Sequence, residues 1–155
     1  MKKLIFLIAV GLGIYYTSHS KHNPVEIKQP SYAEMRVQLE VPGRQIDIVL
    51  FGKMADEEDC RQRTESVWKK LIDGCQTCTF TVVDCKPELA SRYARLFDDT
   101  PISVTYLNLT HGSRLERDGR IVFWGVTAAE SDRMCELASA AFQKRYEGKI
   151  GRAHV

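Results

Sequence analysis

The chain has almost no histidine that could take part in catalysis. It contains four histidines in all, and His19 and His22 lie in a polar stretch near the N-terminus. His154 lies at the C-terminal end, so only His111 falls within the region expected to fold. We expect it in a solvated turn, and a nucleophile activated by histidine therefore has no support here. Walker, glycine-rich dinucleotide-binding and histidine-rich metal motifs are also absent, and no cofactor is expected.

The chain also lacks an excess of charge of either sign. It carries 22 basic and 20 acidic residues, which gives a net charge of +2. The folded region shows no basic stripe, so nucleic acid is not expected as a partner. There is no internal repeat and no low-complexity segment. Residues 35–148 are long enough for one small domain with its own core.

The N-terminus has the pattern of an export segment. Met1-Lys2-Lys3 precedes an apolar run over residues 4–16, which is a short basic start followed by a hydrophobic stretch. Residues 1–20 are therefore expected to be a cleaved signal peptide or a membrane anchor, although a spanning helix usually needs about 20 apolar residues. Residues 21–34 are polar, with two prolines, and are expected to be a linker. Both alternatives place the domain in the periplasm, or on the inner membrane facing it, where disulfides persist.

The last residues match the translation of a sequencing adapter. The codons ATC GGA AGA GCA CAC GTC and a stop TGA encode Ile150 to Val155, and this string lies within a widely used sequencing adapter. The end of the Lys149 codon fits the same adapter. We therefore expect residues 149–155 to be adapter-derived, with the native C-terminus missing. Genomic sequence that continues through the stop codon would contradict this.

Hydrophobic periodicity predicts the element order β-β-α-β-α-β-β-α. Strands are expected at 35–41, 45–51, 79–84 and 102–109, with a turn at Pro42-Gly43 between the first two. A hairpin is expected over 113–124, with Asp118-Gly119 at its turn. Helices are expected over 56–73, from Pro87 to an end marked by Pro101, and after Thr127, which forms a capping box with Glu130. Alternating elements predict an α/β domain with a mixed sheet covered on both faces.

Two helices have an apolar face that is expected to be buried. The first carries Cys60, Thr64, Val67, Trp68, Leu71 and Cys75 at helical spacing. The last carries Met134, Leu137, Ala138, Ala141 and Phe142.

Several local motifs occur in an order known from one fold family. The run Val83-Asp84-Cys85-Lys86-Pro87-Glu88-Leu89-Ala90 joins an acidic strand end to a helix that starts with proline. Thr100-Pro101 precedes a strand, and Gly125 follows the return strand. From residue 45 to 146 the chain resembles the thioredoxin-like fold, with one added N-terminal strand. The resemblance implies a thioredoxin-like mixed sheet in which Pro101 occupies the cis-proline position.

The chain departs from that family at its redox motif. The redox members carry Cys-x-x-Cys at the start of the first helix, where this chain has only Cys60. The two-thiol exchange cycle therefore cannot run there. The alternative is a thiol-disulfide oxidoreductase-like protein that uses Cys60, with Pro101 shaping its substrate groove.

Five cysteines are available, and three interpretations of them stay open. Disulfides that staple an exported domain are the leading interpretation, with candidates Cys60, Cys75, Cys78, Cys85 and Cys135. The spacing does not fix their connectivity, although a bridge from Cys60 or Cys75 to Cys135 is one candidate, because the resemblance places the first and last helices on one sheet face. Cys75 and Cys78 form a Cys-x-x-Cys pair, which is also compatible with a relocated redox pair or a zinc site.

Three further groups of residues each allow a structural or a functional interpretation. Asp98-Asp99 can end a helix in solvent or serve acid-base chemistry. The charged residues from Arg114 to Arg120 suit a solvated hairpin or a partner-binding one. Tyr106, Phe123 and Trp124 suit packing, or a peptide groove beside Pro101.

The sequence favours a non-catalytic, disulfide-stabilised domain of the cell envelope with a protein-binding or assembly role. Its partner is expected to be a protein of the envelope, with membrane contact through residues 4–16 if that segment is not cleaved. The alternatives are a redox protein that uses Cys60 and a zinc-binding module.

Overall fold

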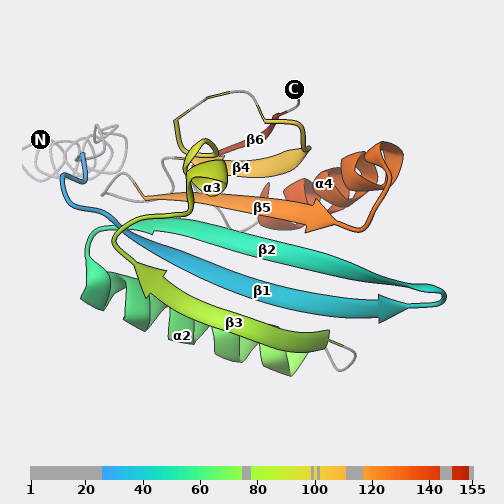
Figure 1. Cartoon of the computed structure of the whole chain (residues 1–155), viewed down its shortest axis with the longest axis horizontal. Helices are drawn as coiled ribbons and strands as arrows, with labels where there is room; N and C mark the ends of the chain where they lie inside the picture. The colour runs from blue at the N-terminus through green and yellow to red at the C-terminus, as the bar shows by residue number, and fades with distance from the viewer. Residues whose placement is uncertain are drawn as a thin grey trace, which may run out of the picture.

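The computed structural model describes residues 26–74, 78–98, 100, 102–110, 117–143 and 148–153. Six strands form one sheet in the order β3-β1-β2-β5-β4-β6 (Figure 1). The elements are β1 (Ser31–Val41), β2 (Arg44–Met54), α2 (Glu57–Gly74), β3 (Cys78–Lys86), α3 (Ser91–Ala94), β4 (Tyr106–Thr110), β5 (Asp118–Trp124), α4 (Ala128–Gln143) and β6 (Lys149–Ala153). The α/β class and the order of the first eight elements are confirmed. The expected adapter-derived segment contributes β6, and its origin in the gene stays a prediction.

The sheet differs from the mixed sheet that the resemblance implied, because each of its strand pairings is antiparallel. The cause is the position of β1. Pro42 and Gly43 close a tight turn after which Val41 pairs with Arg44, and Gly43 has a φ of 82°, which favours glycine. β1 then pairs with β3 along its other edge. β2 and β3 therefore run in the same direction with β1 between them, and α2 makes the crossover.

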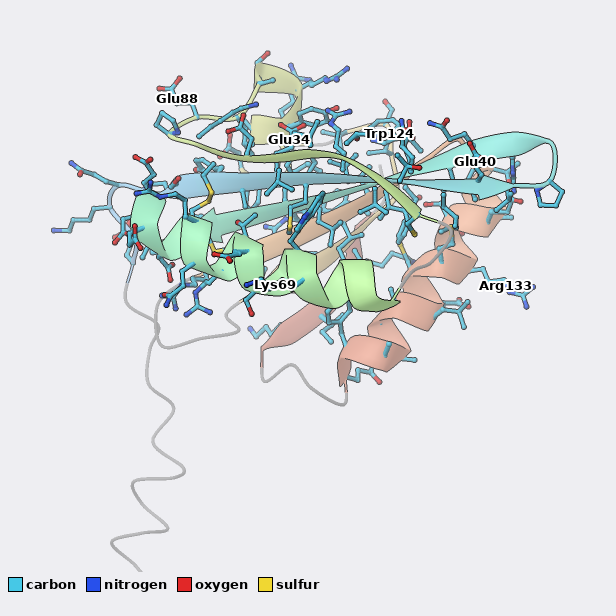
Figure 2. All side chains as sticks on the ribbon, turned by 90° about the horizontal axis from the view of Figure 1, so that it is seen from below. Glu34, Glu40, Lys69, Glu88, Trp124 and Arg133 are labelled. Carbon is cyan, nitrogen blue, oxygen red and sulfur yellow. A yellow bond between two sulfur atoms is a disulfide. The ribbon has the colours of Figure 1, made fainter. Side chains whose placement is uncertain are left out.

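The helices cover both faces of the sheet. α2 and α4 lie on one face and α3 lies on the other (Figure 2). Two clusters of buried residues follow this division. The cluster beneath α3 contains Val49, Phe51, Tyr93, Leu96, Tyr106 and Val122. The cluster beneath α4 contains Leu107, Ile121, Phe123 and Cys135.

The second expected helix is much shorter than predicted. α3 spans only Ser91–Ala94, because Ala90 before it has an extended backbone with ψ 141°. Pro87 therefore precedes the helix and does not begin it. The expected burial still holds, since Tyr93 and Leu96 are buried and Leu89 and Phe97 pack against the same cluster. This segment is held to the sheet by Arg120, whose Nε donates to the Leu96 carbonyl at 2.7 Å.

The expected turn at Asp118-Gly119 is wrong. These residues begin β5, where Asp118 pairs with Lys53 and Gly119 pairs with Gly52. Pairing with the long strand β2 supplies ladder hydrogen bonds that a turn here would forgo. The true connection lies between Thr110 and Arg117. The preceding strand is also shorter than expected: it begins at Tyr106, because the Val104 amide donates to the Ile102 carbonyl at 2.9 Å in a tight turn.

The start of α4 follows the prediction closely. The Thr127 amide donates to Glu130 Oε2 at 2.8 Å, and the Glu130 amide donates to Thr127 Oγ1 at 3.3 Å. The expected capping box is therefore confirmed. The expected buried face is only partly right, because Leu137 is 66% exposed. Ser131 and Cys135 are buried in its place.

No helix within the described ranges is both long and apolar enough to cross a membrane. The export segment at 4–16 and residues 21–25 of the linker lie outside the described residues, so the export assignment stays a prediction. Residues 31–34 of the expected linker belong to β1, where Ala33 and Glu34 are buried.

Candidate functional site

A disulfide joins α2 to β3. Cys60 and Cys85 are bonded, with their Cα atoms 6.1 Å apart. Cys60 lies in the first turn of α2, where its amide donates to the Asp56 carbonyl at 3.0 Å. Cys85 lies near the end of the edge strand. Cys60 is fully buried, and Thr64 Oγ1 lies 3.8 Å from each of the two sulfur atoms. The disulfide therefore lies inside the α2–β3 contact, away from bulk solvent on the Cys60 side.

Cys85 of this disulfide also lines a groove between the helix and the edge strand. We call this the α2–β3 groove, and its volume is about 410 Å³. Its lining residues are Glu57, Arg61, Thr64, Glu65 and Trp68 from α2, and Val83, Asp84 and Cys85 from β3. Val83 is 43% exposed, so the groove offers an apolar surface to solvent.

The groove has an acidic balance. Glu57 and Glu65 line it from α2, and Arg61 is the only lining base among the described residues. Asp84 precedes Cys85 in β3, so its side chain points to the opposite face of the sheet, where it lies 3.1 Å from Lys86. Arg61 donates to Glu58 at 3.1 Å, and Lys69 lies 2.9 Å from Glu65. Both of these pairs are exposed and contribute little to stability. A segment that carries basic and apolar side chains is therefore the best electrostatic match for this groove.

A second charged cluster fixes the N-terminal end of α2. Asp59 Oδ2 accepts from Arg117 Nε at 2.7 Å and from the Ala55 amide at 2.9 Å, while Oδ1 accepts from Arg63 Nε at 2.7 Å. Partial burial alone would raise the pKa of Asp59, but these hydrogen bonds outweigh it and lower the pKa to about 2. The cluster ties the start of β5 to the helix that forms one wall of the groove.

A polar network lies on the other face of the sheet, beside α3. Arg36 donates to Glu34 at 2.8 Å and to the Tyr93 hydroxyl at 3.1 Å. Lys86 lies 3.6 Å from the same Glu34 carboxylate. Glu34 is buried, so both cations compensate its charge there. These residues join β1, β3 and α3. Each charged side chain has a partner within the network, so a structural role explains their presence.

The predicted cysteine sites are only partly brought together. Cys60 pairs with Cys85 and not with Cys135, so that candidate bridge is wrong. The sheet order is the reason: α2 packs over β1 and β3, whereas α4 packs over β4 and β6. Cys135 is a buried free thiol, and burial raises its pKa. Cys78 is also disulfide-bonded, and its partner lies outside the described residues, as does Cys75.

The other candidate residues are scattered. Tyr106 and Phe123 are buried on opposite faces of the sheet, whereas Trp124 is 36% exposed on the α3 side (Figure 2). Asp98 is exposed. Pro101, Asp99 and His111 lie outside the described residues, as do Arg114 and Glu116 of the charged hairpin. Within the described ranges, no three histidine, cysteine or carboxylate side chains are grouped as a metal site.

Sequence reasoning missed the surface role of Val83 and Trp68. Both belong to segments whose periodicity predicted burial. Trp68 is half-buried and lines the groove. The available signal was the run Phe80-Thr81-Val82-Val83, which carries apolar side chains at both odd and even positions. In an edge strand, such a run leaves one apolar residue near solvent.

Comparisons with known proteins leave the family open. A scan against protein-family models found no matching model, a search of the curated proteins found no match, and no solved structure matched the chain.

Proposed function

We propose that this chain is a non-catalytic protein-binding domain that captures an extended peptide segment along the outer edge of β3. The observation that carries the proposal is the combination of an open sheet edge and an adjoining groove. β3 is the terminal strand of the sheet order, and no described strand pairs with its outer edge. The α2–β3 groove runs beside that edge and supplies pockets for side chains.

The edge suits strand addition. An edge strand presents a row of backbone donors and acceptors that another extended segment can pair with. Peptide-recognition domains use such an edge for affinity and adjacent pockets for specificity. Between Thr79 and Val83, β3 carries no charged side chain and no proline. Two of the devices that block unwanted pairing, charge and proline, are therefore missing from this part of the edge. A third is present, because Arg36 pairs with Val82 and Val37 with Phe80, which leaves a β-bulge in β3 between Phe80 and Val82.

The disulfide gives the groove a fixed geometry. Cys60 belongs to the helix that forms one wall and Cys85 to the strand that forms the other, so the bond holds α2 at a set position relative to the edge strand. A preorganised groove loses less entropy when it binds a peptide than a mobile one would. This structural role accounts for the bond without any turnover of thiols.

The location of the domain is part of the proposal. An export segment over 4–16 and disulfide-bonded cysteines both favour the periplasm, or the inner membrane facing it. The partner is then an extended segment of a cell-envelope protein, with basic and apolar side chains that match the groove. The thioredoxin-like kinship stays a hypothesis supported by the element order from β2 to α4, whereas β1 between β2 and β3 is an added feature.

The binding test uses a library of soluble peptides of about ten residues, the length of strand that a sheet edge of this size can pair. Peptides enriched on the oxidised domain are measured by fluorescence anisotropy. Val83→Lys places a charge in the groove and is expected to weaken binding at least about tenfold. Leu137→Lys is the matched control, because it changes an exposed apolar residue on α4, and it should leave binding unchanged. Equal loss in both variants, or no loss in either, would contradict the proposal.

A second measurement locates the peptide. Amide hydrogen exchange in β3 should slow when an enriched peptide binds, because new cross-strand hydrogen bonds protect the edge. Protection confined to other strands would place the binding site elsewhere. Self-association of the domain that Val83→Lys abolishes would assign the edge to a second copy of the chain instead.

A redox assay separates this proposal from the leading alternative. If the domain is non-catalytic, it should not accelerate the reduction of insulin by dithiothreitol. Robust reduction that is lost in Cys60→Ser would favour the thiol-disulfide alternative. The zinc alternative requires the thiolates of Cys75 and Cys78, which a disulfide does not supply, so metal that binds stoichiometrically to the reduced domain would be needed to support it.

A further inference from the structure

We propose that a cavity beside α3, on the opposite face of the sheet from the α2–β3 groove, binds a carboxylate that carries an apolar body. We call it the α3 pocket, and its volume is about 520 Å³, within the usual range for small-molecule sites. Its lining residues are Ser91, Arg92, Tyr93, Arg95, Leu96, Ile102, Ser103, Val104, Val122 and Trp124. This site is independent of the peptide-binding proposal.

The floor of the α3 pocket is apolar and rigid. Leu96 and Val122 are both buried in the cluster beneath α3, and Ile102 and Val104 pack against the same cluster. Trp124 follows Val122 by two positions in β5, so both side chains lie on one face of the strand. This arrangement offers a hydrocarbon chain or ring a preformed surface whose burial is favourable.

The rim of the α3 pocket is cationic. Arg92 and Arg95 both line it and are exposed, and neither makes an ion pair with another described residue. The Arg92 guanidinium lies over the Tyr93 ring, with Cζ 4.4 Å from the ring centroid. Stacking of this kind restrains the guanidinium plane and leaves its N–H edge available. The described lining includes no carboxylate, so the positive charge of the rim is not neutralised from within.

Two hydroxyl groups accompany the arginines. Ser91 begins α3, and Ser103 occupies the apex of the tight turn that the Val104 amide closes on the Ile102 carbonyl at 2.9 Å. Both serines line the pocket. Serine hydroxyls donate to anions, and arginine binds a carboxylate through two parallel hydrogen bonds. A carboxylate at the rim and an apolar body on the floor therefore satisfy both halves of the cavity.

The two tryptophans of the chain make the pocket directly measurable. Trp124 forms part of the α3 pocket, whereas Trp68 lies in the α2–β3 groove. A Trp68→Phe variant of the full chain has Trp124 as its single indole reporter. Octanoate is expected to change its fluorescence in a saturable way. Octanol lacks the charge and acetate lacks the apolar body, so each should bind at least about tenfold more weakly than octanoate.

Arginine variants test the rim. In the same background, Arg92→Gln combined with Arg95→Gln should reduce octanoate affinity at least about tenfold. Arg133→Gln is the matched control, because Arg133 points away from the protein on α4 (Figure 2). Circular dichroism establishes that each variant is folded. Unchanged affinity in the double variant would overturn the proposal.

The ligand series decides the remaining outcomes. Octanol binding as tightly as octanoate would show an apolar surface without anion selectivity and would overturn the proposal. Octyl phosphate binding more tightly than octanoate would overturn the carboxylate assignment. The absence of any saturable change with octanoate would overturn the site itself, and none of these outcomes depends on peptide binding at β3.

Discussion

Arg117 and Asp59 lie 58 positions apart in the sequence and are joined by two hydrogen bonds, one of 2.7 Å and one of 3.0 Å. The contact fastens the start of β5 to the first turn of α2. It therefore links the half of the sheet that carries α4 to the half that carries the disulfide.

Asp59 should make the stability of the domain depend on pH in the acid range. Its pKa in the folded protein is about 2, below the value of about 3.9 for an unperturbed aspartate. Its contribution is therefore fully present above pH 4 and is lost as the pH falls toward 2. Asp59→Asn should lower the free energy of unfolding at neutral pH by about 1–2 kcal/mol and flatten this acid dependence. Urea denaturation at several pH values measures both effects.

Glu58→Gln is the control for this prediction. Glu58 pairs with Arg61 on the exposed side of the same helix, and its loss should change stability by less than about 0.5 kcal/mol. If the wild-type and Asp59→Asn proteins lose stability in parallel below pH 4, the assignment to Asp59 is wrong.

Arg120 should be essential for holding the α3 segment to the sheet. Its side chain is 2% exposed, and its guanidinium carbon lies 4.6 Å from the centroid of the Phe97 ring. Arg120→Met would leave the Leu96 carbonyl without this donor, and we expect a loss of about 2–3 kcal/mol. Faster hydrogen exchange at Tyr93 to Phe97 should accompany the loss. Arg133→Met, an exposed control, should change neither measurement, and an equal effect in both variants would contradict the prediction.

Two glycines should respond differently to alanine. Gly43 and Gly125 both have a positive φ, at 82° and 76°. A Cβ at Gly43 meets nothing within 4 Å, whereas a Cβ at Gly125 would lie 2.6 Å from the Gln45 carbonyl oxygen. Gly43→Ala should therefore cost only the backbone strain, about 1 kcal/mol. Gly125→Ala should cost clearly more, because the start of α4 must move away from β2. Thermal denaturation compares the two, and equal losses would show that the close approach is unimportant.

The disulfide should be the main covalent brace of the α2–β3 half. It closes a loop with a sequence separation of 25, for which loop-closure entropy predicts a stabilisation of about 3 kcal/mol. Replacing Cys60 and Cys85 together by serine should lower the free energy of unfolding by about that amount, and it leaves no unpaired thiol from this bridge. Peptide mapping should recover a Cys60–Cys85 cross-link. Recovery of a Cys60–Cys135 cross-link would contradict the structure.

Local signals in the sequence predicted those features that depend on neighbouring residues. The capping box depends only on Thr127 and Glu130, and the hairpin turn depends only on Pro42 and Gly43. Both were predicted correctly. Asp118-Gly119 looked like a turn for the same local reason, but long-range pairing with Lys53 and Gly52 overrides it. The register of a sheet is a tertiary property that a short motif does not encode.

The residues of the candidate site were harder to predict from the sequence than the helices and strands were. Burial of Val67 and Leu137 was expected from helical periodicity, yet both are exposed. The apolar face of each helix is wider than the part of that face that contacts the sheet, so residues at its margin remain in solvent. The α2–β3 groove lies where β3 pairs with β1. β3 follows β2 in the chain but does not pair with it. Strand order of this kind cannot be deduced from the sequence of elements alone, so the groove became visible only in the structure.

The place of β1 in the sheet also suggests an order of events during folding. The β1–β2 hairpin closes through local contacts that assemble within microseconds, whereas β3 reaches β1 only across the long α2 connection, so we expect the hairpin to form first. The sulfur atoms of Cys60 and Cys85 then meet only after α2 has crossed the hairpin and β3 has docked. We therefore expect an oxidising catalyst to meet a domain that is already nearly assembled. The bond would then form after this half of the molecule has folded and would not direct its folding. Trapping free thiols at successive times during refolding would show whether β3 docks before the disulfide forms.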